Sequence, residues 1–260
     1  MKAKRNRAEF RKAVDKADVV VEVLDARDPP SFRIPQVEEK IKQMGKGLVL
    51  AINKIDLVPQ RVYVGRTKYF EQQGYHATYV SATKRMGTRI LRTVIKKAAP
   101  DPNKDTIYVA IVGYPNVGKS TIINVLRGRH GAPTGSLPGV TRYAQEFRLG
   151  QKIRVLDTPG VYPIEDIDEM VYKGAISPEE LSDPVPHAIK LIERLRELDP
   201  NVIKKHYKVD HPDPEKALEL IAKRRGLLLK GGEPNVEEAA RLVIRDRHRG
   251  KIVVRREPPV

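Results

Sequence analysis

The stretch GYPNVGKS, at residues 113–120, constrains the fold of this chain more than any other feature. It has the spacing G-x-x-x-x-G-K-[ST] and lies between an apolar run, TIYVAIVG, and a segment with a helical pattern. In that context the glycines let backbone N–H groups close on phosphate oxygens at a helix N-terminus. The pattern therefore predicts a phosphate-binding loop between a strand and a helix, with a plain glycine-rich turn as the alternative.

Strand and helix patterns alternate along the first part of the chain. Four strand patterns, at residues 18–26, 47–54, 76–82 and 106–113, are apolar and rich in β-branched residues, as is typical of parallel strands covered on both faces. Two short strand patterns follow at residues 144–149 and 152–157. The helical patterns lie at residues 35–44, 59–73, 88–99 and 119–129. This alternation predicts an α/β domain with a mostly parallel six-stranded sheet and helices on both faces.

The pattern changes in the last third of the chain, where helix follows helix. These segments lie at residues 185–198, 213–225 and 235–249. Gly226 and Gly250 follow the last two, as glycine often does at a helix C-terminus. We place a domain boundary near residue 165, which predicts an α/β domain over 1–165 and a small α-helical domain over 166–260.

The motif NKID, at residues 53–56, predicts recognition of guanine. It follows an apolar run and is therefore expected at the carboxyl edge of the sheet, where open α/β sheets bind ligands. The Asp56 carboxylate can accept from both the ring N–H and the exocyclic amine of guanine, a donor pair that adenine lacks. Asn53 would brace the loop, and the stem of Lys54 would lie along the base. Taken alone, NKID also fits an ordinary turn.

Further candidate residues lie at the ends of other predicted strands. Lys119 would reach the β- and γ-phosphates, and Ser120 would ligate Mg²⁺. In DTPG, at residues 157–160, Asp157 would hold Mg²⁺ through water and the Gly160 N–H would meet the γ-phosphate. Thr141 is a further candidate magnesium ligand, and the N–H that follows Ser81 could contact the guanine oxygen. The predicted nucleotide site comprises Asn53, Lys54, Asp56, Ser81, Ala82, Asn116, Val117, Gly118, Lys119, Ser120, Thr121, Thr141, Asp157 and Gly160.

The guanine motif precedes the phosphate loop here, whereas ordinary GTPases have the opposite order. A site assembled from loops at one edge of a sheet depends on where the strands lie, not on which strand comes first. Joining the usual termini through the polar connector at 99–105 and opening the chain before Asp18 would keep the site intact, because domain termini often lie close together. Both motifs are therefore compatible with one circularly permuted domain.

The order NKID, Ser-Ala, GYPNVGKS, Thr141 and DTPG resembles the circularly permuted GTPases of ribosome assembly, and residues 214–251 resemble the C-terminal helical domain of the YlqF branch. The resemblance covers nearly the whole chain. A sister branch that acts on the small subunit carries an OB barrel and a zinc module. The absence of cysteine and the short sequence before Asp18 disfavour that branch. The resemblance implies a GTP-dependent switch that uses Mg²⁺ and docks on ribosomal RNA of a large-subunit precursor.

The residue after DTPG bears on catalysis. It is Val161, where Ras-like enzymes have a glutamine that orients the attacking water. An apolar side chain cannot do this, so charge compensation must come from elsewhere. Asn116 matches the position that the resembling GTPases use to help bind K⁺, although it could merely shape the loop. We expect slow unaided hydrolysis, activation by ribosomal particles and potassium, and as candidate catalytic residues Lys119, Thr141, Gly160 and Asn116.

Basic residues exceed acidic ones by 49 to 33, which gives a net charge of +16 and favours a polyanionic partner. The residues that we assign to RNA are Arg89, Arg92, Lys96, Arg245, Arg249, Arg255 and Arg256. Arg89, Arg92 and Lys96 recur at helical spacing, which also fits an ordinary solvated face. Cations near a helix C-terminus complement its dipole, but Arg255 and Arg256 lie beyond the last predicted helix.

Other functional classes are constrained by composition. The chain has no cysteine, which excludes disulfides and thiolate zinc sites and favours a cytoplasmic location. Its apolar runs are too short to span a bilayer, so we expect no membrane partner, and we expect a monomer. Two alternatives to a ribosome-assembly GTPase remain open. They are a GTPase of translation or tRNA metabolism, and a nucleotide-gated protein-binding scaffold with negligible turnover.

Overall fold

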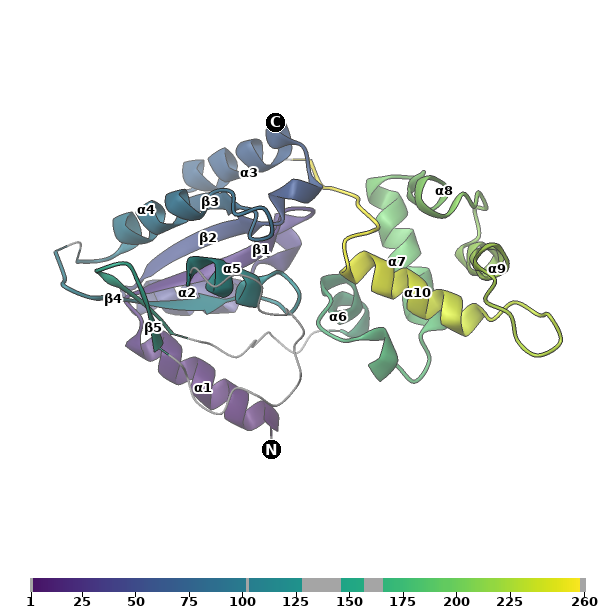
Figure 1. The fold of residues 1–260 in the computed structure, drawn as a ribbon, viewed down its shortest axis with the longest axis horizontal. Helices are drawn as coiled ribbons and strands as arrows, with labels where there is room; N and C mark the ends of the chain where they lie inside the picture. The colour runs from purple at the N-terminus through teal and green to yellow at the C-terminus, as the bar shows by residue number, and fades with distance from the viewer. Residues whose placement is uncertain (1, 102, 128–145, 157–165, 258–260) are drawn as a thin grey trace. The chain divides into compact units, whose positions relative to one another are not determined.

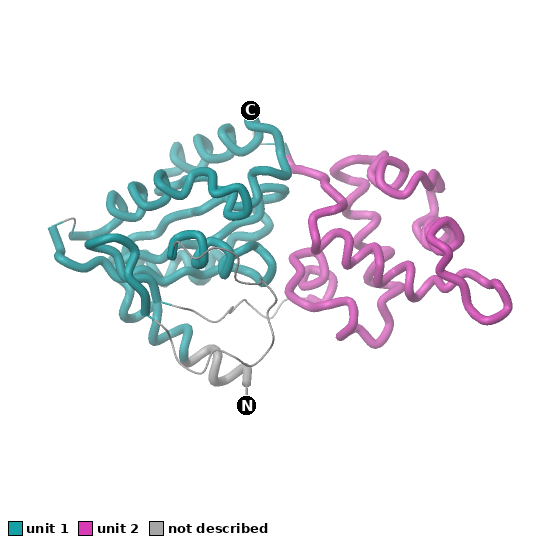
Figure 2. Tube along the Cα trace, viewed as in Figure 1, with its two compact units in different colours: residues 1–163, 257–260 teal, residues 164–256 magenta. Residues whose placement is uncertain are grey.

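The computed structural model describes residues 2–101, 103–127, 146–156 and 166–257, with side chains from Glu9 onward. The chain divides into two compact units, residues 1–163 with 257–260 and residues 164–256 (Figure 2). Glu257 belongs to the first unit, where its carboxylate accepts from Arg61 at 3.1 Å. Domain limits at 1–165 and 166–260 remain a prediction.

The first unit is built on a six-stranded sheet with the order β3-β2-β1-β4-β6-β5 (Figure 1). The strands are β1 Val19–Asp25, β2 Gly47–Asn53, β3 His76–Val80, β4 Ile107–Val112, β5 Glu146–Leu149 and β6 Ile153–Leu156. Only β5 runs antiparallel, to β6, and the other pairs are parallel. The six-stranded, mostly parallel sheet expected from the sequence is confirmed.

Helices cover both faces of this sheet. They are α1 Lys2–Lys16, α2 Pro35–Gln43, α3 Gln60–Gln72, α4 Thr88–Ala98 and α5 Lys119–Leu126, with short 3₁₀ turns at Pro29–Phe32 and Ile55–Leu57. Val20 of β1 packs with α1 and α2, whereas its neighbour Val19 faces Gly47, which lies against the Ala98 carbonyl at the end of α4. Because successive side chains of a strand point to opposite faces, α4 covers the face opposite α1 and α2.

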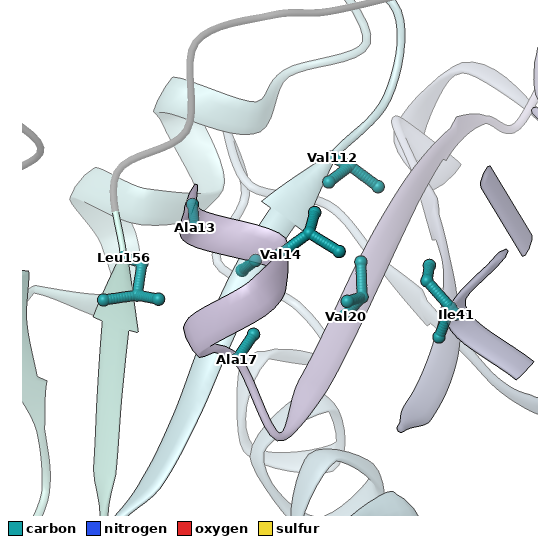
Figure 3. Close-up of a cluster of buried hydrophobic side chains, with 8 residues drawn as sticks. Ala13, Val14, Ala17, Val20, Ile41, Val112 and Leu156 are labelled. Atoms are coloured by element: carbon teal, nitrogen blue, oxygen red, sulfur yellow. The ribbon is translucent and has the colours of Figure 1, made fainter. Parts of the chain in front are cut away.

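Helix α1 is an element that the sequence analysis did not predict. Its residues Ala13 and Val14, with Ala17 just beyond its end, are buried in a cluster with Val20, Val112 and other residues of the sheet (Figure 3). With Phe10 they have the i, i+3, i+4, i+7 spacing of one helix face. The high charge of the helix masks this short apolar stripe, which is stabilised by packing on β4.

The direction in which strands are added to the sheet reverses between β1 and β4. From β1 the chain proceeds outward to β2 and β3, and it then returns to the other side of β1 with β4 and β6. Ligands of open α/β sheets bind at such a reversal, beyond the carboxyl ends of the strands. The loops that follow β1, β2 and β4 therefore converge at one edge.

The second unit is helical. Its elements are α6 Ile167–Lys173, a 3₁₀ turn Pro178–Glu180, α7 Val185–Leu198, α8 Val202–Tyr207, α9 Pro214–Arg225 and α10 Val236–His248. Asp213 and Asn235 cap α9 and α10 by accepting from backbone N–H groups, as such residues do at helix N-termini. The buried faces of α7, α9 and α10 form the core, with Leu191, Leu218 and Val243 among its members. Across both units, no described helix is long and apolar enough to cross a membrane.

Candidate nucleotide-binding site

The phosphate loop connects β4 to α5 in a backbone conformation that requires glycine. Gly113 has φ +135° and Gly118 has φ +99°, and both lie in the region that L residues rarely adopt. A Cβ atom on Gly113 would lie 2.6 Å from the Val23 carbonyl oxygen, and one on Gly118 would lie 2.2 Å from Asn53 Nδ2. The loop therefore lies directly against β1 and Asn53, with α5 beginning at Lys119. These features fit a phosphate group held by backbone N–H groups at a helix N-terminus.

Lys119 folds back over this loop. Its ammonium group donates to the carbonyl oxygens of Gly113 at 2.8 Å and Tyr114 at 2.5 Å. Removal from water, together with the nearby positive charge of Lys54, lowers the pKa of Lys119 to about 7. A bound polyphosphate would favour the charged form of Lys119. We therefore expect nucleotide binding to be coupled to protonation of this lysine.

We expect Mg²⁺–GTP binding above pH 7 to take up a proton at Lys119, approaching one per nucleotide at about pH 8.5. The bound ammonium would then be charged, whereas the free protein is largely neutral at this position. The affinity should accordingly fall as the pH rises through 7. Calorimetric titration in buffers of different ionisation enthalpy measures the uptake. Lys119→Arg is the control, because arginine stays charged and should show none; equal proton uptake in both proteins would contradict the assignment.

Asn53 joins three of the predicted loops. Its Nδ2 atom donates to the carbonyl oxygen of Val117 at 2.7 Å, and its Oδ1 atom accepts from the Ala82 N–H at 3.1 Å. The side chain is 2% exposed, so loss of either bond would leave a buried polar group unpaired. The Ala82 N–H, which was expected to contact guanine, thus has Asn53 as its partner in the structure. Its contact with the base remains a prediction.

Asp56 lies at the open edge of this assembly. It is exposed in the 3₁₀ turn after β2, and its Oδ1 atom accepts from the Ser81 hydroxyl at 2.5 Å. The Ser81 oxygen in turn accepts from the Lys84 N–H at 3.2 Å. The hydroxyl thereby fixes one carboxylate oxygen and orients the group, which makes Ser81 a positioning residue for Asp56.

Asp25 and Arg27 were missed by the sequence analysis. Asp25 ends β1, and its buried carboxylate accepts from Arg27 Nε at 2.9 Å, Arg27 Nη2 at 2.8 Å and Lys54 Nζ at 2.9 Å. Lys54 itself has a left-handed backbone with φ +65°. The ion pair with Asp25 holds the Lys54 side chain in place within the guanine motif. The sequence could have indicated these two residues, because DARD, at residues 25–28, follows an apolar run and ends at the same sheet edge as NKID.

The magnesium ligands are only partly described. Ser120 is exposed in the first turn of α5, with Thr121 beside it, which fits a hydroxyl ligand next to the phosphate loop. Thr141, Asp157 and Gly160 lie outside the described residues, as does Val161. Bound Mg²⁺ would neutralise charge on the phosphates, and among the described residues Ser120 is the predicted ligand that lies beside the phosphate loop.

The basic residues of α4 differ in their surroundings. Arg89 and Lys96 are exposed, whereas Arg92 is half-buried and donates to the Leu126 carbonyl at 3.3 Å. Leu91 is buried, but Ile90 is 45% exposed. The face of α4 that remains open to solvent is thus mixed rather than purely basic.

The basic residues of the C-terminal region also differ. Arg245 donates to Glu179 at 2.8 Å and lies 3.5 Å from Glu238, so much of its charge is already compensated. Arg249 and Arg256 are exposed and Arg255 is half-buried. Contact of these residues with RNA remains a prediction.

Comparisons with known proteins agree with this geometry. A family signature described as "50S ribosome-binding GTPase" matches residues 108–222. An uncharacterized GTP-binding protein of Methanocaldococcus jannaschii is 41% identical over 93% of this chain and 64% of its own length. A nucleolar GTP-binding protein 2 of Yarrowia lipolytica is 36% identical over 94% of this chain and 49% of its own length. The chain thus spans between about half and two thirds of the length of these relatives.

The fold is shared with a solved structure. GNP-bound YlqF from T. maritima superposes with a TM-score of 0.69 and 26% identity, over 99% of each chain. This likeness includes both the permuted order of the strands and the helical segment that follows them. The chain therefore belongs to the circularly permuted GTPases of the YlqF family.

Proposed function

We propose that this protein binds GTP with Mg²⁺, hydrolyses it slowly and acts as a nucleotide-dependent switch on ribosomal RNA during large-subunit assembly. The observation that carries the proposal is the position of Asn53. Its one side chain bonds both the phosphate loop and the loop of Ser81 and Ala82, next to an exposed Asp56. A carboxylate that can recognise guanine and a loop that can bind phosphate, held together in this way, fit a guanine nucleotide.

The residues of the site divide the work of binding. Asp56, oriented by Ser81, would accept from the guanine edge, and Lys54, anchored by Asp25, would support the face of the base. The loop from Gly113 to Gly118 and Lys119 would hold the phosphates, where charge grows during transfer. Thr141 and Gly160 would respond to the γ-phosphate, which distinguishes the GTP state from the GDP state.

The ribosomal part of the proposal is supported by the net charge of +16 and by the names of the relatives, which include nucleolar proteins and a 50S-binding family. Co-sedimentation with large-subunit precursors tests it. Binding should be tighter with a non-hydrolysable GTP analogue than with GDP, and Thr141→Ala should remove the difference. Equal binding in both nucleotide states would refute the switch. Turnover that particles do not stimulate would favour the scaffold alternative, whereas preference for tRNA would favour the translational one.

We further infer that K⁺ assists hydrolysis at Asn116. This residue lies in the phosphate loop and has a left-handed backbone, with φ +59°. GTP turnover should be several-fold faster in KCl than in NaCl at equal ionic strength, and Asn116→Ala should lose this difference while still binding GDP. Identical rates in the two salts would remove the ion and leave ribosomal particles as the activator.

The proposal takes the protein to be a cytoplasmic monomer. Sedimentation equilibrium of the purified chain, with GDP and with a GTP analogue, tests the oligomeric state. A dimer that forms only with the analogue would require a second copy in the switch.

A further inference from the structure

The chain between α9 and α10 forms an ordered hairpin, residues 227–235. The Asn235 N–H donates to the Leu227 carbonyl at 2.8 Å, and the Leu229 N–H donates to the Glu233 carbonyl at 2.8 Å. Gly231 and Gly232 make the turn with φ +107° and +86°. The backbone of the α9–α10 hairpin is therefore held by its own hydrogen bonds, outside the helical core.

Two leucines are presented to solvent on this hairpin. Leu228 is 51% exposed and Leu229 is 50% exposed, more than any other large hydrophobic residue in the described part of the chain. Isolated exposed leucines are common on protein surfaces. Two adjacent ones on a hydrogen-bonded turn are different, because the ordered backbone keeps them from folding back onto the core.

Exposed positive charges lie on both sides of these leucines in the sequence. Lys223 and Arg224 are exposed on the last turn of α9, and Lys230 is exposed at the tip of the hairpin. Among the described residues none of these three forms an ion pair, whereas several other cations of the unit are paired. Examples are Arg241 with Glu237, Arg245 with Glu179 and Lys204 with Asp210. The dipole of α9 accounts for cations in its last turn but not for Lys230.

We propose that the α9–α10 hairpin is a docking element for structured RNA. Lys223, Arg224 and Lys230 would contact phosphates, and Leu228 and Leu229 would pack against an unpaired base or the sugar edges of a minor groove. The proposal rests on the proposed RNA docking of the whole protein and locates it on a surface outside the residues assigned from the sequence.

RNA is the partner that this surface fits best. Phosphates complement the three cations, and Glu233 is the single acidic residue between 223 and 235. The minor groove of an RNA helix is wide and shallow, and unpaired bases are open to apolar contact. Leucine is among the side chains that proteins insert between bases or into grooves.

Two variants of the intact chain separate the contributions. Leu228→Ser with Leu229→Ser should weaken binding to protein-free large-subunit ribosomal RNA about tenfold without changing its salt dependence. Lys223→Gln, Arg224→Gln and Lys230→Gln together should weaken binding and lower the log–log salt slope by roughly one unit for each phosphate that is no longer neutralised. Lys204→Gln, Lys205→Gln and Lys216→Gln together are the matched control, because all three lysines are exposed but paired with carboxylates. GDP affinity should be unchanged in all three.

The outcomes distinguish the hairpin from the wider proposal. If the wild type binds the RNA and neither hairpin variant weakens binding, the hairpin proposal fails while RNA docking stands. If only the cation variant has an effect, the leucines do not touch the RNA and the proposal as stated is overturned. If the leucine variant loses binding to ribosomal particles but not to the protein-free RNA, the partner is a protein. If the wild type binds neither RNA nor particles, the proposed function itself fails.

Discussion

Asp56→Asn is expected to change the preferred nucleotide from GTP to XTP, with a shift in the ratio of affinities of about 10⁴. The Ser81 hydroxyl now donates to Asp56 Oδ1 at 2.5 Å. In the variant it can donate to the amide oxygen, which directs the amide NH₂ toward the base. Guanine presents donors at this edge and would face another donor, whereas the added oxygen of xanthine can accept. Competitive titration of GTP and XTP measures the ratio.

Ser81 provides a control for this explanation. In Asp56→Asn with Ser81→Ala the amide is no longer oriented and can rotate to present its oxygen. Part of the GTP affinity should therefore return, and the preference for XTP should shrink. If Asp56→Asn keeps the wild-type preference for GTP, the NKID segment is a turn without a role in base selection.

Gly118→Ala is expected to reduce the affinity for both GTP and GDP by about 10² to 10³. The positive φ of +99° costs an alanine about 1–2 kcal/mol. The new Cβ would lie 2.2 Å from Asn53 Nδ2 and must displace it. Loss of the buried bond to Val117 costs about 1–3 kcal/mol more. Because nucleotide binding must restore the displaced loop, the total of about 2–5 kcal/mol lowers the affinity by about 30- to 4,000-fold at 1.4 kcal/mol per tenfold, a range that includes the expected loss. Fluorescence titration with labelled nucleotides measures the loss.

Gly74→Ala is the matched control for this prediction. Gly74 has φ +84°, but a Cβ there would have no heavy atom within 4 Å. This variant should lose about 1 kcal/mol of unfolding free energy and no nucleotide affinity. Equal affinities of Gly118→Ala and Gly74→Ala would show that the contact with Asn53 does not support the phosphate loop.

Much of the sheet could be predicted because its strands carry a strong and regular signal. The apolar runs before NKID and GYPNVGKS are long enough to be buried on both faces, and each motif follows its strand directly. Helix α1 was not predicted because its charged residues outnumber the few apolar residues of the stripe that begins at Phe10. Its helical state depends on the sheet surface that it covers, which no local pattern shows.

The motifs of the candidate site could be predicted from the sequence, but the hydrogen bonds that join them could not. Asn53 and Asp56 could be assigned from spacing, but the bonds of Asn53 to Val117 and Ala82 depend on how three loops converge. The anchoring of Lys54 by Asp25 depends on the parallel pairing of β1 and β2. The lowered pKa of Lys119 likewise arises from burial in the folded loop.

The strand order also has a consequence for biosynthesis. β1 pairs with β2 soon after it in the chain, but its other neighbour, β4, is translated only after β2, β3 and their helices. Short-range pairings form faster than long-range ones, and domains fold from the N-terminal side during synthesis. The loops that select the base can therefore assemble while the phosphate loop is still inside the exit tunnel of the translating ribosome. Insertion of β4 into the centre of the sheet then completes the pocket, so that a nascent chain acquires its nucleotide only after its central strand has been added.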